Sequence, residues 1–366
     1  MTSLHYLALG PGISDAGLVH LAKLNELREH VIGVSDSAPA TAKRDSKKAM
    51  GASAAAVAFK VRATLRGHAN APSNVVFSPD GSLMASVAFN KVLLWDGVSG
   101  KKLHPITLKR GALWGAAFTP DSKLFASGSN VGCVFLWETS SGKEKMRLET
   151  ENTLFTAVDI DPQGKYVAAG GQDGKVYLWE LPTGKLLQSF QASAGDFFTA
   201  AAFSADGAML ATSGRDSFVA LWHIPSGKKA TELHGPPKEN HYDMIRDVAF
   251  RPGDTSLAAV HPDGAIRLWN TSEAKEIAAL RCSAPGKSSF PAWALAFHPG
   301  GKILATASDG DTLVRLWDVS SRQQIAEFQT GADGNKVDAV AFSPDGKTLA
   351  TNGKGGSLLL LDVGIG

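Results

Sequence analysis

Residues 75–96 read Val-Val-Phe-Ser-Pro-Asp-Gly-Ser-Leu-Met-Ala-Ser-Val-Ala-Phe-Asn-Lys-Val-Leu-Leu-Trp-Asp, the first full copy of the pattern from which the fold is predicted. An apolar strand ends at Phe77, and the Ser-Pro-Asp-Gly that follows has the residue chemistry of a tight turn. A second strand leads through a short turn at Asn90 into a third strand, which closes on Trp95 and Asp96. The stretch therefore predicts three short strands joined by tight turns.

The same phrase recurs in register along the chain. Its first strand closes on Phe77, Phe118, Ile160, Phe203, Phe250, Phe297 and Phe342. Its third strand closes on Trp95, Trp137, Trp179, Trp222, Trp269, Trp317 and Leu361. The mean period is about 44 residues, within the roughly 40–45 of a four-stranded propeller blade. The pattern predicts an all-β fold, a seven-bladed β-propeller.

A fourth strand follows each Trp, except at the end of the array. The last copy is followed only by residues 363–366, whereas the first is preceded by a spare segment, Val61–Leu65, that matches the fourth strands. We expect this N-terminal segment to pair with Ser357–Asp362 as the outer strand of the seventh blade. Such closure would remove the open edges that a linear stack exposes.

Over about residues 58–363 these copies resemble WD40 repeats, of a degenerate, bacterial type. In that family a Gly-His pair, a Ser or Thr, an Asp and the Trp form a buried hydrogen-bonded network. Gly67, His68, Ser86 and Trp95 match it, with Asn90 in the region of the Asp. Four later Asp residues stand six before a Trp without the matching His: Asp173, Asp216, Asp263 and Asp311. We expect these to organise their turns.

The first 56 residues have a different character. Residues 1–30 contain a leucine rhythm over 4–27, including Ile-Ser-Asp-Ala-Gly-Leu at 13–18, that resembles a single leucine-rich repeat, a short strand followed by a helix. One such repeat cannot bury its apolar face alone. The segment is thus a remnant, an element that docks elsewhere, or a loose tail. Residues 31–56 are rich in Ala, Ser and Lys and are expected to be a flexible linker before a propeller at 57–363.

Composition limits the partners and the compartment. The net charge of +2 gives no support to a nucleic-acid or membrane-surface footprint, and no apolar run is long enough for a membrane helix. The two cysteines, Cys133 and Cys282, lie in different repeats, so a disulfide framework is not expected. These features favour a cytoplasmic chain that is monomeric. The Ala-rich stretch at 49–59 after basic residues leaves an export signal as the alternative.

No catalytic, metal or cofactor constellation stands out. His234 and His241 share a loop with Asp243, but the paired spacing of a metal site is missing, and a solvated loop explains them better. We therefore expect no enzyme activity and no cofactor. A catalytic site in the channel remains the least supported reading.

The remaining signal is a rim. In the resembled family the residue four before the closing Phe faces one mouth of the ring. Here those positions are Ser73, Trp114, Thr156, Thr199, Arg246, Trp293 and Asp338. Trp114 and Trp293 are the two Trp residues outside the repeated strand ends, and exposed aromatic and Arg side chains are typical of binding hot spots. The alternative is that both rings tuck between blades as extra core.

These observations predict a non-catalytic scaffold that binds a protein or peptide partner at the propeller mouth. The alternative is a sensory or small-ligand-binding module derived from a larger bacterial signalling protein. The functional part of both readings rests on likeness of fold, which hosts many roles.

Overall fold

The computed structural model describes residues 57–150, 153–192, 198–216, 218–235, 244–281, 292–308, 311–332 and 336–364. These residues belong to one compact unit, Ala54–Gly366. The leucine-rich segment at 1–30 and the linker at 31–56 lie outside the described residues.

The described residues form seven antiparallel four-stranded sheets, called blades 1–7 here in chain order. Blade 1 contains β2 (Asn74–Phe77), β3 (Leu83–Ala88), β4 (Lys91–Asp96) and β5 (Lys102–Thr107). Blade 2 contains β6 (Leu113–Phe118), β7 (Leu124–Ser129), β8 (Cys133–Glu138) and β9 (Glu144–Glu149). Blade 3 contains β10 (Phe155–Ile160), β11 (Tyr166–Gly171), β12 (Lys175–Glu180) and β13 (Lys185–Gln191).

The next three blades repeat this order. Blade 4 contains β14 (Phe198–Phe203), β15 (Met209–Gly214), β16 (Phe218–His223) and β17 (Lys228–His234). Blade 5 contains β18 (Val248–Phe250), β19 (Ser256–Val260), β20 (Ala265–Asn270) and β21 (Lys275–Arg281). Blade 6 contains β22 (Ala292–Phe297), β23 (Ile303–Ser308), β24 (Leu313–Asp318) and β25 (Gln323–Gln329).

Blade 7 is assembled from both ends of the array. It contains β26 (Val340–Phe342), β27 (Thr348–Asn352), the short 3-10 turn η2 (Lys354–Gly356), β28 (Leu358–Gly364) and, outside β28, β1 (Ala58–Leu65). β1 runs antiparallel to β28, and Val61 lies opposite Leu361. This is the pairing that a closed ring requires.

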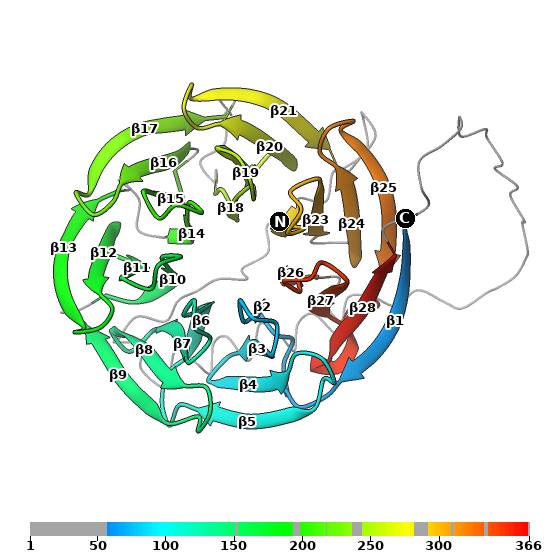
Figure 1. Ribbon diagram of the computed structural model, residues 1–366, viewed down its shortest axis with the longest axis horizontal. Coiled ribbons are helices and arrows are strands. Elements are labelled where there is room, and N and C mark those ends of the chain that lie inside the picture. Colours follow the sequence, from blue (N-terminus) through cyan, green and yellow to red (C-terminus); the bar gives the residue numbers. More distant parts are fainter. Residues whose placement is uncertain are drawn as a thin grey trace, which may run out of the picture. The chain divides into compact units, whose positions relative to one another are not determined.

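The blades are arranged radially, with the first strand of each nearest the common axis and the fourth at the circumference (Figure 1). Each inner strand contacts the inner strand of the next blade, and β26 contacts β2. The inner strands end at the seven residues predicted from the repeat, from Phe77 to Phe342. The prediction of an all-β, seven-bladed propeller is confirmed.

The core lies between neighbouring blades. Val134 and Leu136 of β8, for example, pack in one cluster with Trp179 of the following blade, and Trp179 is fully buried. Full burial of a large apolar side chain contributes about 1.5–3 kcal/mol. Since each recurring Trp fills such an interface, the seven sheets are stacked rigidly side by side.

Among the described residues, no helix is long and apolar enough to cross a membrane.

Candidate functional site

The predicted rim residues lie at one end of the sheets, where the inner strands begin. We call this end the upper face. The loops from each outer strand to the next inner strand and the turns between second and third strands share it, because strand direction alternates in each blade. Trp114, Thr156, Thr199 and Trp293 are the second residues of β6, β10, β14 and β22, and Ser73, Arg246 and Asp338 precede β2, β18 and β26.

The structure brings three of these residues together: Arg246, Trp293 and Asp338. The guanidinium carbon of Arg246, from blade 5, lies 4.1 Å from the centroid of the half-buried indole ring. The Nζ of Lys336, from blade 7, lies 3.8 Å from the same ring and 3.9 Å from a carboxylate oxygen of Asp338. We call Arg246, Trp293, Lys336 and Asp338 the Trp293 cluster. A cation over an indole ring is worth about 0.5–1 kcal/mol at an exposed site.

Lys336 was not anticipated, and neither was the residue that positions it. The buried Asn352, at the end of β27, accepts hydrogen bonds from the backbone N–H groups of Asp338 (2.9 Å) and Ala339 (3.2 Å). Its amide donates to the carbonyl of Lys336 at 3.1 Å. One buried amide thus holds the loop that carries both charges of blade 7.

The carboxylate of Asp247 links the segment that carries Arg246 to the strand that carries Trp293. Asp247, next to Arg246, accepts hydrogen bonds from the N–H groups of Val248 (2.9 Å) and, across the blade boundary, of Leu295 (2.9 Å). Burial raises the pKa of Asp247 to about 7, against the opposing effect of these two hydrogen bonds. Because Leu295 is two residues from Trp293 in β22, this contact fixes the relation of Arg246 to the indole.

The other rim positions are used differently. The hydroxyl of Thr156 donates to the carbonyl of Phe198 at 2.8 Å, and that of Thr199 donates to the carbonyl of Ile245, so both tie one blade to the next. The exposed Ser73 bonds only to the carbonyl of Val87 among the described residues. These three hydroxyls serve as braces.

Trp114 differs from Trp293 in its surroundings. Both rings are half-buried at a bulge in the inner strand, but among the described residues no cation lies over the ring of Trp114. The carbonyls of Trp114 and Gly115 both accept from the hydroxyl of Ser127 at 2.9 Å. Gly115 has a φ of 59°, and a Cβ there would lie 2.8 Å from the backbone N of Val158 in blade 3. The two unmatched Trp residues therefore share a repeat position but not an environment.

Blade 1 contains the polar network that the sequence indicated. The Nε2 of His68 lies 2.7 Å from the hydroxyl of Ser86, which also accepts a 2.9 Å hydrogen bond from the indole N–H of Trp95. A Cβ on Gly67 would lie 2.7 Å from a terminal methyl of Leu93, so a larger residue there would require that side chain to shift. The Nδ1 of His68 has no partner among the described residues, because Asn90 directs its amide to the carbonyl of Leu108. Burial and then the charge of Lys91 lower the pKa of His68 to about 4.

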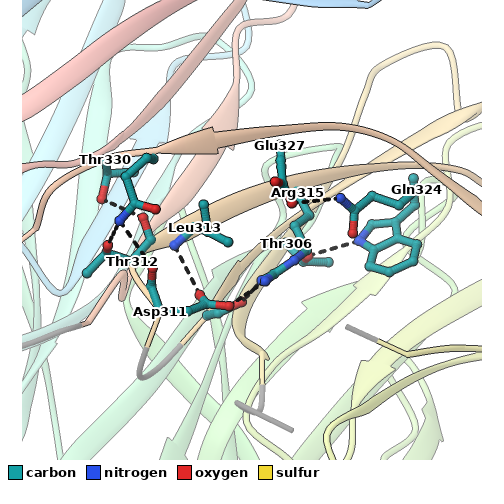
Figure 2. A network of polar contacts seen from close by, with 11 residues as sticks. Thr306, Asp311, Thr312, Leu313, Arg315, Gln324, Glu327 and Thr330 are labelled. Carbon is teal, nitrogen blue, oxygen red and sulfur yellow. Dashed lines mark hydrogen bonds and ion pairs between the residues drawn. The ribbon is translucent and has the colours of Figure 1, made fainter. Parts of the chain in front are cut away.

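Blade 6 holds the corresponding turn by a charge pair, as Figure 2 shows. Arg315, 6% exposed, donates to the carboxylate of Asp311 and to the hydroxyl of Ser308 (2.7 Å). Asp311 also accepts from the backbone N–H of Leu313 at 3.1 Å, and the indole of Trp317 donates to Thr306 at 3.0 Å.

Two more blades use the same place, two residues before the Trp, to bind the turn Asp. In blade 5, Arg267 donates to both oxygens of Asp263 (2.7 and 2.6 Å), and in blade 3 the hydroxyl of Tyr177 donates to Asp173 at 2.6 Å. Burial alone would raise the pKa of Asp263, but the hydrogen bonds from Arg267 and Ala265 hold it well below its usual range. These Asp residues therefore organise their turns, and their partners stabilise them. The signal for these partners was present in the sequence as an Arg or Tyr four residues after the turn Asp.

The loop that begins at His234, a metal-site candidate in the sequence, shows no set of metal ligands in its described part. The Nε2 of His234 lies 3.1 Å from a carboxylate oxygen of Glu232, while His241 and Asp243 lie outside the described residues. Within the described ranges, no group of three or more His, Cys, Asp or Glu side chains could hold a metal ion.

Comparison with known proteins agrees with this architecture. Residues 59–96, 142–180, 184–223, 233–270, 280–318 and 322–362 match the family model for the WD domain, G-beta repeat. The stretch between the first two matches contains β6, β7 and β8, which nevertheless form a four-stranded blade with β9. The repeat is thus retained in structure where the motif has diverged.

Similar curated proteins share short stretches of the chain. The small ribosomal subunit protein RACK1 of Brassica napus is 44% identical over 63 residues, 17% of this chain and 19% of that protein. The transcriptional corepressor LEUNIG_HOMOLOG of Arabidopsis thaliana is 32% identical over 83 residues, 23% of this chain and 10% of that protein. Coronin-7 of Rattus norvegicus is 31% identical over 95 residues, 25% of this chain and 10% of that protein. Each match covers less than a fifth of the relative's length, and these relatives are eukaryotic. By its matched repeats and its seven blades, the chain belongs to the WD40 repeat family.

Proposed function

We propose that this protein is a non-catalytic platform that binds a protein or peptide partner on its upper face, with the Trp293 cluster as the main contact. The observation that carries the proposal is the half-buried indole of Trp293 between Arg246 and Lys336. Trp and Arg are enriched among the residues that dominate binding energy at protein interfaces. Asp338 adds an acceptor beside these cations.

The construction of the cluster supports a binding role. Its residues come from three successive blades, and the buried Asn352 and the half-buried Asp247 hold the segments that carry them. Side chains held in place before binding lose less conformational entropy when a partner arrives. A rigid ring of sheets with a preset aromatic and charged contact is therefore suited to recognising a partner rather than to transforming a substrate.

The relatives are compatible with this proposal. One is named as a protein of the small ribosomal subunit and another as a transcriptional corepressor. The matched segments are short, so the likeness supports the general role of an interaction scaffold, and the partner of this chain is left to experiment.

The test is capture of partners by the full chain, with each captured protein identified by mass spectrometry and its binding to purified chain then measured directly. Trp293→Ala is expected to weaken binding of the partner about tenfold or more, since hot-spot truncations cost about 2 kcal/mol or more. Leu187→Ala, on the outer strand β13, removes another exposed apolar side chain and is the matched control. Equal affinity of Trp293→Ala and the parent would contradict the proposed contact.

Several further properties belong to this proposal. We place the chain in the cytoplasm on the basis of its two cysteines, and we expect no nucleic-acid binding on the basis of its net charge of +2. We further propose that it is a monomer. Cys133, the cysteine that the structure describes, is buried and free. A bacterial source and a leucine-rich repeat before the propeller remain predictions.

A further inference from the structure

A second feature of the upper face, around the exposed Phe89, lies on blades 1 and 2, whereas the Trp293 cluster lies on blades 5, 6 and 7. Phe89 is the first residue of the two-residue turn between β3 and β4, and its side chain is 62% exposed. Its φ is 51°, in the left-handed region, while Asn90 is not among the residues with positive φ. Hairpin turns of this kind usually have glycine at the first position, and a bulky residue there is strained.

The corresponding turns of the other blades show how unusual Phe89 is. In blades 2, 3 and 5 this turn has three or four residues, and its left-handed residue, the last one, is a glycine, namely Gly132, Gly174 and Gly264. In blade 6 it is Thr312, which is buried and whose carbonyl accepts from the backbone N–H and the hydroxyl of Thr330. Only the backbone of Phe89 is so used: its carbonyl accepts from Leu113 at 2.7 Å, while the ring stays exposed.

The loop at 108–112 joins Phe89 to the neighbouring turn of blade 2. Leu108 donates to the carbonyl of Asn90 at 2.9 Å, and Ala112 donates to the side chain of Asn130 at 2.7 Å. A Cβ on Gly111 would lie 2.6 Å from Val131, which is itself 47% exposed. The loop is thus held from both sides, with an apolar side chain at each end.

Two cations lie on this loop between the apolar side chains. Lys109 and Arg110 are both exposed, and neither forms an ion pair within the described part of the chain. The loop and the two turns beside it contain no acidic residue from 108 to 112, at 89–90 or at 130–132. A ligand that complements this surface must carry negative charge between apolar groups.

We propose that Phe89, Lys109, Arg110 and Val131, the Phe89 edge, dock a carboxylate-rich peptide segment whose apolar side chains contact Phe89 and Val131. This inference rests on the proposed role as a protein-binding platform and adds a second contact with a stated chemistry. Two cations are too few for a nucleic-acid footprint, and the exposed ring supplies the apolar contact that a peptide side chain can use. The strain at Phe89 is explained if the exposed ring is kept for binding.

The first experiment selects binders from a library of random short peptides on the full chain. The expected result is enrichment of peptides that combine Glu or Asp with aromatic or Leu residues. Enrichment of basic or uncharged peptides, or of none, would overturn the proposal. So would charge-dependent binding of the chain to phosphatidylserine vesicles without any selected acidic peptide.

The second experiment measures the affinity of a selected acidic peptide by fluorescence anisotropy. We expect Lys109→Glu with Arg110→Glu to raise the Kd tenfold or more, and added salt to weaken binding to the parent. Phe89→Gly should raise the Kd severalfold while leaving the melting temperature unchanged or higher, because glycine suits the left-handed φ. A loss of binding in this variant therefore cannot come from unfolding.

Matched controls come from the opposite face. Val98, 74% exposed, and the exposed Lys101 lie in the turn between β4 and β5, and Val98→Ala and Lys101→Glu should leave the Kd unchanged. If Trp293→Ala abolishes binding of the acidic peptide and the Phe89-edge variants do not, the Phe89 edge is refuted while the proposed function stands. If the edge variants alone lose the peptide, the inference holds whatever the outcome of partner capture at the Trp293 cluster.

Discussion

Blades 1 and 6 share a four-stranded architecture, but different polar networks stabilise their second and third strands and the turn between them. In blade 1, neutral groups do this work: His68 and Trp95 meet on Ser86, and Asn90 binds Leu108. In blade 6, the charged pair Asp311–Arg315 takes over, and the pair of Trp317 with Thr306 is kept (Figure 2). The shared element is the bond between the Trp and a hydroxyl on the second strand, which persists when the rest of the network changes.

Comparison of the two blades indicates how a repeat diverges. A residue two before the Trp points back along its own hairpin to the turn, so an Arg there can bind the turn Asp without a contact from another part of the chain. The replacement is local, needs no change elsewhere in the chain and recurs in blade 5 with Arg267 and Asp263. Divergence within a blade thus leaves the packing between blades intact.

Removal of the charged pair of blade 6 should lower the free energy of unfolding more than any other change proposed here. Asp311→Ala leaves the buried Arg315 without its carboxylate, and loss of one partner of a buried ion pair costs about 3–5 kcal/mol. Urea unfolding at neutral pH measures it. In blade 1, Asn90→Ala removes one neutral hydrogen bond and should cost about 1 kcal/mol.

A double variant tests the cause. Asp311→Ala combined with Arg315→Leu should recover much of the lost stability, since no buried charge is then left unpaired. A double variant no more stable than the single one would show that the ion pair is not what holds the turn.

The neutral network of blade 1 should make the stability of the chain depend on pH through His68. The pKa of His68 is about 4 in the folded chain and about 6.5 in the unfolded one, so the unfolded chain binds more protons between these values. The contribution of the neutral His68 to the free energy of unfolding is therefore complete above pH 6.5. It falls by about 3 kcal/mol as the pH falls from 6.5 to 4, at about 1.4 kcal/mol per pH unit.

The measurement is the unfolding free energy of the parent and of His68→Gln across this range. His261, Asp159 and Asp247 also have shifted pKa values, but they titrate in both proteins, so their contributions cancel in the difference. The advantage of the parent should shrink toward pH 4. A difference that stays constant with pH would contradict a neutral His68.

A small gain in stability is expected from giving Trp269 of blade 5 a hydrogen-bond acceptor. Trp269 of blade 5 has a buried indole N–H without a partner among the described residues. Ala259 lies opposite Arg267, as Thr306 lies opposite Arg315 and Ser86 opposite Leu93. Ala259→Ser should supply the missing acceptor and stabilise the chain by about 1 kcal/mol. Ala258→Ser, buried one residue earlier, is the control and should destabilise it.

The fold could be predicted almost completely because its signals are local and repeated. The ends of the inner strands follow from the apolar residue before each turn, and the Trp series sets the register. The same register placed Arg246, Trp293 and Asp338 at one end of the sheets. It could not separate Trp293 from Trp114, since the difference lies in neighbouring blades, which place two cations over the ring of Trp293.

Other parts of the site depend on contacts that no repeat position encodes. Lys336 stands two residues before the counted position, and Asn352, which holds its loop, lies on another strand. The dipeptide Phe89–Asn90 has no residue that signals a left-handed first position, so the exposed ring over blade 1 became visible only in the structure.

The pairing of β1 with β28 sets an order of events during synthesis. Val61 and its partner Leu361 are about 300 residues apart, so β1, the first propeller strand to be synthesised, is the last to find its sheet. Until then its backbone N–H and C=O groups form an unsatisfied edge that another chain could join. The chain is therefore expected to need protection at β1 during synthesis, and to be most prone to aggregation just before the ring closes.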